Sequence, residues 1–210
     1  MSDLALTTVP ASAPPSRSAL RRQLADLRVP PRSAALLGDG AAGSRADAPA
    51  TVAIGAALAA VVSHLATGMT DPLCYERGVA RLVGLGPGLT PTGDDVLVAL
   101  VATSRRLAAG GLLRSAAADQ LAAAVATLPA ARTTATAYRL LSETIGGRFP
   151  EPLADFVGAL GDPGIDHATL SELLDRLAAI GAHSGADWIA GVIALARVCL
   201  AQGGAAWPSA

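Results

Sequence analysis

Hydrophobic residues recur at helical spacing along most of the chain, and short segments rich in glycine, proline or small polar residues interrupt the pattern. Runs such as AAADQLAAAVATL consist of residues with high helix propensity, and their small side chains let helix axes approach closely. From residue 50 onward the punctuation predicts helices at about 50–66, 72–83, 94–109, 115–128, 134–146, 150–160, 169–180 and 185–202.

The first fifty residues are less regular. Residues 1–16 hold three prolines among small polar residues, which predicts an extended or mobile lead-in. A helix is expected in SRSALRRQLADLRV, whose leucines share one face. The next segment, PPRSAALLGDGAAGSRADAPA, resembles a loop, although its AALLG and the later TVAIG are compatible with short strands. The expected organisation is a lead-in (1–16), a helix and loop (17–49) and a helical core domain (50–205).

Composition narrows the fold class. The chain has 210 residues, of which 51% are hydrophobic and only 3% aromatic, so the core must consist of aliphatic side chains in close-packed helices. We therefore predict a mainly all-α single domain of about eight helices around a buried glycine-rich loop, with room for a few short N-terminal strands. The net charge is −1 without blocks of either sign, which argues against a nucleic-acid or polybasic membrane surface.

Three sequence patterns bear on the cellular compartment of the protein. The N-terminus has no basic start followed by an apolar stretch, as a signal peptide would. The longest apolar runs are too short for a membrane span or contain Arg197. The two cysteines show no disulfide-framework or metal-binding spacing and are expected to be core thiols. A soluble cytoplasmic protein is therefore expected.

The stretch GLGPGLTPTGDD, residues 84–95, can be explained in part as punctuation. Gly84 and Gly86 could end one helix, and Thr92 could cap the next, with Asp95 completing a capping-box pattern. The same pattern occurs at Thr169, where nothing suggests chemistry. This explanation requires neither the combination of Gly86, Gly88 and Gly93 nor a second aspartate beside Asp95.

A ligand site explains the remainder. Glycines at this spacing let backbone N–H groups turn toward one centre, and a helix N-terminus adds donors and positive potential for a phosphate or carboxylate. Thr90 and Thr92 supply hydroxyl groups, while Asp94 and Asp95 suit a Mg²⁺ ion, a substrate amide or general-base catalysis. The spacing matches neither the dinucleotide fingerprint nor the P-loop. Apart from Mg²⁺ on Asp94 and Asp95, the sequence indicates no cofactor.

A second candidate segment is IGAHSGADWIAGVIALA. Ser184 is expected to cap a helix, with Asp187 three residues later. Gly185 in the first turn and Gly191 further along favour close approach of neighbouring backbone. His183 could move a proton or contact an anion, and the alternative is an ordinary surface histidine.

A third candidate segment is ARTTATAYRLL, where another helix is expected to begin. Arg132 offers forked donors to a carboxylate or phosphate, and the alternative is a solvated loop arginine. Thr133 and Thr134 add hydroxyl groups at the same helix start. We hypothesise that the three helix starts converge on one small anionic ligand.

The order GLGPGLTPTGDD, TT, GGRFPEPL and HSGADWIAG resembles the AllH-like family of oxamate carbamoyltransferase subunits over roughly residues 73–203. The resemblance implies transfer of a carbamoyl group from oxalurate to phosphate, beside other kinds of subunit or in a homo-oligomer. The candidates carried over by motif are Gly84, Gly86, Gly88, Thr90, Thr92, Gly93, Asp94, Asp95, Thr133, Thr134, Ser184 and Asp187. One departure is Ala137, where the resemblance leads us to expect a serine.

Three functions are therefore open. The first is a carbamoyltransferase-type enzyme or subunit, with Asp94, Asp95 and His183 as catalytic candidates. Orientation of the reactants and donors aimed at the developing oxyanion would assist that reaction. The second is a non-catalytic anion-binding scaffold subunit. The third is an enzyme that binds a phosphoester or nucleotide with Mg²⁺ on Asp94 and Asp95.

Overall fold

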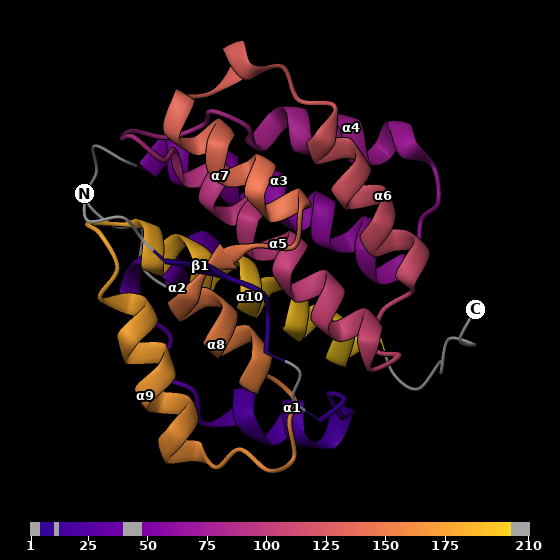
Figure 1. Cartoon of the computed structure of the whole chain (residues 1–210), viewed down its shortest axis with the longest axis vertical. Coiled ribbons are helices and arrows are strands. Elements are labelled where there is room, and N and C mark those ends of the chain that lie inside the picture. The colour runs from indigo at the N-terminus through magenta and orange to yellow at the C-terminus, as the bar shows by residue number, and fades with distance from the viewer. Residues whose placement is uncertain (1–4, 11–12, 40–47, 203–210) are drawn as a thin grey trace.

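Two central helices organise the fold: α5 (Thr92–Ala109) and α10 (Ser184–Ala201) pack along each other in the middle of the molecule (Figure 1). The computed structural model describes residues 5–10, 13–39 and 48–202. Every residue from Thr92 to Ser104 is buried, as expected of a helix surrounded by other helices. The predicted all-α fold is confirmed.

The remaining elements surround this pair. In Figure 1, α3, α4, α6 and α7 occupy the upper half, and α1, α8 and α9 the lower half. The helices are α1 (Arg17–Ala25), α2 (Pro31–Leu37), α3 (Ala48–Thr67), α4 (Pro72–Leu82), α6 (Ser115–Ala126), α7 (Ala135–Ile145), α8 (Glu151–Ala159) and α9 (His167–Ala178), with a 3₁₀ turn η1 (Ala130–Arg132). The predicted helix positions from residue 50 onward agree with these bounds to within a few residues.

Close contact between the central helices depends on Gly191 of α10. A Cβ atom at this position would lie 2.8 Å from the Ala99 Cβ and 3.0 Å from the Val96 carbonyl oxygen of α5. A Cβ at Gly185 would likewise overlap the Leu177 carbonyl of α9. The expectation that these two glycines allow close backbone approach is confirmed.

Strand placement near the N-terminus differs from the expectation. AALLG forms the end of α2, and TVAIG lies in α3, so neither is a strand. The interpretation of residues 30–50 as a loop was also wrong where α2 forms. Short apolar runs do not distinguish a strand from a buried helix, and here α2 packs against α10 and α3. The observed two-residue strands are β1 (Leu6–Thr7) and β2 (Phe149–Pro150), which pair antiparallel. The stretch 40–47 lies outside the described residues.

The expectation that the longest apolar segments are too short for a membrane span was wrong for two helices. Pro49–Thr67 and Ser184–Ala201 are each long and apolar enough to cross a membrane by length and composition, with mean hydropathies of 1.8 and 1.4. Two-thirds of the second segment (67%) is buried inside the protein, where α10 packs on α5. The length of α10 therefore reflects its place in the core.

Candidate functional site

The glycine-rich loop joins α4 to α5 and lies at the surface. Gly84, Gly86 and Gly88 all have positive φ, at 70°, 114° and 105°, a backbone conformation that favours glycine. Residues 87–89 are exposed, and burial begins only at Pro91. The expectation of a buried loop was therefore wrong: the loop covers the start of α5, and only its last residues enter the core.

The starts of three helices meet at this loop. The Thr133 hydroxyl, just before α7, donates to Asp94 Oδ2 of α5 at 2.9 Å. The Thr134 hydroxyl donates to the Leu89 carbonyl of the loop. The hydroxyl groups of Thr90 and Ser184, the first residue of α10, hydrogen bond to each other at 2.9 Å. The structure thus brings the three predicted segments together.

Asp94 is bound by the protein itself. Its Oδ2 accepts hydrogen bonds from the Gly84 N–H and the Thr133 hydroxyl, both at 2.9 Å. Burial raises the pKa of the Asp94 carboxyl, and these two donors oppose the shift. Because Asp94 joins the loop, α5 and the start of α7, its main contribution in this structure is to hold the site together.

Replacing Thr133 by valine is expected to destabilise the protein by about 1–3 kcal/mol, because the buried Asp94 carboxylate loses one of two donors. Chemical denaturation at pH 8 measures the change. The matched control is Thr136→Val at a half-buried position of α7, and this variant is expected to stay within about 0.5 kcal/mol of the wild type. Equal losses in both variants would contradict the assigned role of the Thr133 hydroxyl.

Asp95 has a different environment. Only 1% of it is exposed, and neither carboxylate oxygen has a hydrogen-bond partner among the residues that the structure describes. Burial, the nearby Asp187 and, to a lesser extent, Asp94 raise the pKa of Asp95 to about 7, while the neighbouring hydroxyls of Ser184 and Thr90 oppose the shift without reaching hydrogen-bond geometry. The carboxyl can therefore accept or donate a proton near neutral pH.

Thr92 and Asp187 both bind Arg32 of α2. Arg32 Nε donates to Asp187 Oδ1 at 2.8 Å, and Arg32 Nη2 donates to Thr92 Oγ1 at 2.9 Å. Arg32 was missed in the sequence because PPRSA looked like part of a loop. The only available signal was that a buried Asp187 would need a cation, and the chain offers 16 basic residues without a rule for choosing among them.

The expected capping residues were wrong at three helix starts. The structure places the N-caps at Pro91, His183 and Asp166 in place of Thr92, Ser184 and Thr169. Thr92 and Ser184 are the first helical residues, and their hydroxyls face Arg32 and Thr90. At α7 the helix begins where it was expected, and Thr134 caps it by accepting from the Ala137 N–H at 3.1 Å.

The other candidates lie around the edge of the site. His183 is exposed at the N-cap of α10. Arg132 is exposed as well and donates to the Ala80 carbonyl of α4 at 2.9 Å. Gly93 is a packing position, because a Cβ there would overlap the Leu82 carbonyl. In the described part of the chain the N–H groups of Gly86 and Gly88 donate to no other residue, so both are available to an anion.

The two adjacent aspartates have different surroundings. Asp94 faces Gly84 and Thr133, whereas Asp95 lies near Thr90 and Ser184. Within the described residues, no group of three or more His, Cys, Asp or Glu side chains is arranged to hold a metal ion. Both hydrogen bonds of Asp94 go to its Oδ2, and its buried Oδ1 has no hydrogen-bond partner among the described residues.

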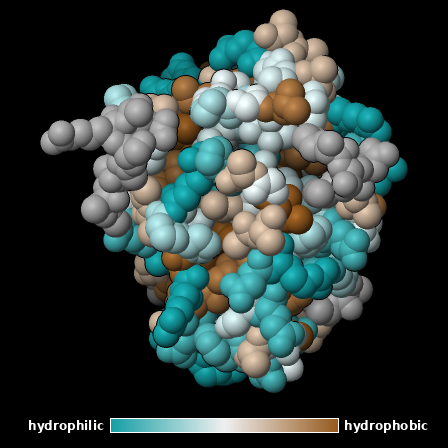
Figure 2. Space-filling view, turned by 90° about the vertical axis from the view of Figure 1, so that its left-hand side faces the viewer, coloured by the Kyte–Doolittle hydropathy of each residue, from teal (hydrophilic) through white to brown (hydrophobic). Residues whose placement is uncertain are grey.

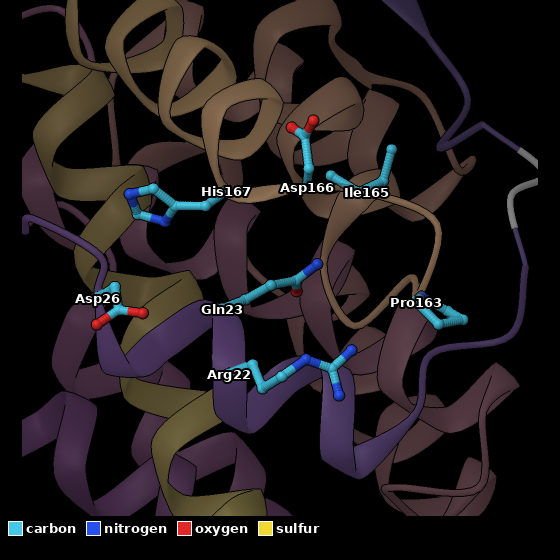
Figure 3. A pocket seen from close by; sticks show the side chains of 7 residues that line it. All are labelled: Arg22, Gln23, Asp26, Pro163, Ile165, Asp166 and His167. Atoms are coloured by element: carbon cyan, nitrogen blue, oxygen red, sulfur yellow. The ribbon is translucent and has the colours of Figure 1, made fainter.

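A separate cavity of about 360 Å³ lies between α1 and the start of α9 (Figure 3). Gln23 in its wall is buried, and its amide is bonded to backbone groups of residues 159–162. The charged side chains around it, such as Arg22, Asp26 and Asp166, are exposed, and Figure 2 shows that hydrophilic residues dominate this lower part of the surface. None of the predicted site residues lines this cavity.

Comparison with known proteins identifies one family. The family model described as oxamate carbamoyltransferase subunit AllH matches residues 82–196, more than half of the chain and a narrower range than the resemblance indicated. The match begins at the end of α4 and includes the whole loop and the starts of α5, α7 and α10. No curated protein and no solved structure matches the chain.

Proposed function

Because the chain belongs to the AllH family of oxamate carbamoyltransferase subunits, we propose that its glycine-rich loop and the adjoining helix starts form a carbamoyl-transfer site in which Asp95 moves the proton. The family description as a subunit implies a multi-subunit complex. The observation that carries the proposal is the buried Asp95 carboxyl without hydrogen-bond partners among the described residues, with a pKa of about 7.

The proposed reaction joins oxalurate and hydrogen phosphate to give oxamate and carbamoyl phosphate. A phosphate oxygen attacks the carbamoyl carbon, and the bond from this carbon to the oxamate nitrogen breaks. The phosphate loses its proton and the departing nitrogen gains one, so a single group that accepts and then donates a proton completes the exchange. A carboxyl with a pKa near neutrality suits both halves of this task.

The negative charge of the buried aspartates determines how the substrates are oriented in the proposed site. Asp94, Asp95 and Asp187 are all buried, and only Asp187 has a cation bound to it, Arg32, so an anion directly against the carboxylates would be repelled. The neutral carbamoyl group therefore faces Asp95, and the phosphate or substrate carboxylate faces the Gly86 and Gly88 N–H groups. The Thr90 and Ser184 hydroxyls orient the reacting group next to Asp95.

Reconstitution with candidate partner subunits tests the proposal. Carbamoyl phosphate formation from oxalurate and phosphate is measured with the complete complex, with the complex lacking this chain, and with this chain alone. We expect turnover only where this chain is present. Full turnover by the partners without it would overturn the assigned role.

A further inference from the structure

Arg32 connects the two central helices at the candidate site, although it lies outside the segment that the family model matches. Its guanidinium binds Asp187 through two hydrogen bonds, at 2.8 and 3.2 Å, and Thr92 through a third at 2.9 Å. The next residue, Ser33, donates to the Ala186 carbonyl at 2.6 Å and fixes α2 against the first turn of α10.

The burial of the two partners is unequal. The Asp187 side chain is 1% exposed, whereas that of Arg32 is 30% exposed. A buried carboxylate without a cation would be strongly unfavourable, and a guanidinium can satisfy both of its oxygens at once. Arg32 therefore provides, from the solvent side, the positive charge and the forked geometry that Asp187 requires.

We propose that Arg32 is a positioning residue of this site: by holding Asp187 and Thr92 together it keeps the first turns of α5 and α10 in register around Asp95 and neutralises the Asp187 charge beside that carboxyl. The inference rests on the proposed role of Asp95 and adds a residue that acts on it through Asp187.

The surroundings of Asp95 support this indirect action. Its charged neighbours are Asp187 on α10 and Asp94 on its own helix, and its polar neighbours are Ser184 and the loop residue Thr90. Arg32 contacts Asp187 and reaches Asp95 only through it. Loss of Arg32 leaves an unpaired carboxylate beside Asp95, whereas loss of Asp187 removes the repulsion.

The titration midpoint of Asp95 in the full-length chain tests the proposal without substrate. Unfolding free energies are measured from pH 5 to pH 9 for the wild type and for each Arg32 or Asp187 variant, with and without Asp95→Asn. The difference that Asp95→Asn makes, plotted against pH, gives the titration midpoint of Asp95. We expect Arg32→Gln to raise this midpoint by about one unit or more and Asp187→Asn to lower it by a similar amount. Arg32→Lys keeps the charge but loses the fork, and its midpoint should stay near that of the wild type.

Unchanged midpoints in Arg32→Gln and Asp187→Asn would overturn the proposal, because a purely stabilising ion pair alters stability without moving the titration of Asp95. If Arg32→Gln does not fold, Asp187→Asn decides, since it leaves only a half-exposed arginine unpaired. Unchanged midpoints together with lost turnover in Asp95→Asn would reject Arg32 and retain the proposed function. Shifted midpoints with full turnover in Asp95→Asn would retain the role of Arg32 and reject the proposed function of Asp95.

Discussion

Replacement of Asp95 by asparagine is expected to stabilise the protein at pH 8 and to flatten its stability between about pH 4 and pH 7. The folded protein holds the Asp95 proton more tightly than the unfolded chain does, because the pKa is raised from 3.8 to about 7. Stability therefore falls as the pH rises through this window and levels off above it. A shift of three units corresponds to about 4 kcal/mol, and the amide left without partners offsets about 1–3 kcal/mol of this.

Chemical denaturation from pH 5 to pH 8 measures the effect, with a net gain of about 1–3 kcal/mol expected at pH 8. The control is Asp166→Asn at the exposed N-cap of α9. The Thr169 N–H lowers the pKa of Asp166, so its contribution is present at high pH and is lost as the pH falls. That loss lies below the ordinary value of 3.8, so from pH 5 to pH 8 Asp166→Asn should differ from the wild type by a constant amount, whereas the difference for Asp95→Asn should change with pH. Parallel pH curves for Asp95→Asn and the wild type would contradict the assignment.

The same Asp95 variant is expected to lower carbamoyl transfer by a factor of about 100 or more, because the amide cannot carry a proton. Opposite changes in stability and turnover would identify Asp95 as a residue retained for chemistry at the expense of stability. If the reconstituted complex with Asp95→Asn turned over at the wild-type rate, the catalytic assignment would be wrong.

Gly93→Ala is expected to cost on the order of 3 kcal/mol or to prevent folding, the largest loss among the loop positions. Its Cβ would overlap the carbonyl of Leu82, which is backbone and cannot rotate away, so α4 and α5 must move apart. Thermal and chemical denaturation measure the loss. Because the same shift would displace Asp94 and Asp95, turnover should fall together with stability.

The matched control for Gly93 is Gly88→Ala in the same loop. A Cβ there would meet only the Thr90 carbonyl oxygen at 3.9 Å, so the cost is that of the positive φ alone, about 1–2 kcal/mol. A smaller loss for Gly93→Ala than for Gly88→Ala would show that α4 and α5 adjust easily, contrary to the packing described.

The sequence alone determined where most helices lie, because hydrophobic spacing and glycine or proline punctuation act over a few neighbouring residues. It also located the loop, since glycines at positive φ leave a recognisable composition. It placed AALLG and the caps of α5, α9 and α10 incorrectly, because short apolar runs and Ser, Thr or Asp patterns allow more than one local arrangement.

Only the tertiary structure decided the roles of the two adjacent aspartates. Asp94 and Asp95 are equivalent in the sequence, but residues far along the chain, such as Thr133 and Ser184, determine which carboxyl is bound and which is left without donors. The same holds for Arg32, which binds Asp187, a residue 155 positions further along the chain. Helix formation depends on local contacts, whereas the charge and hydrogen bonding of a buried carboxyl depend on whatever the packing brings next to it.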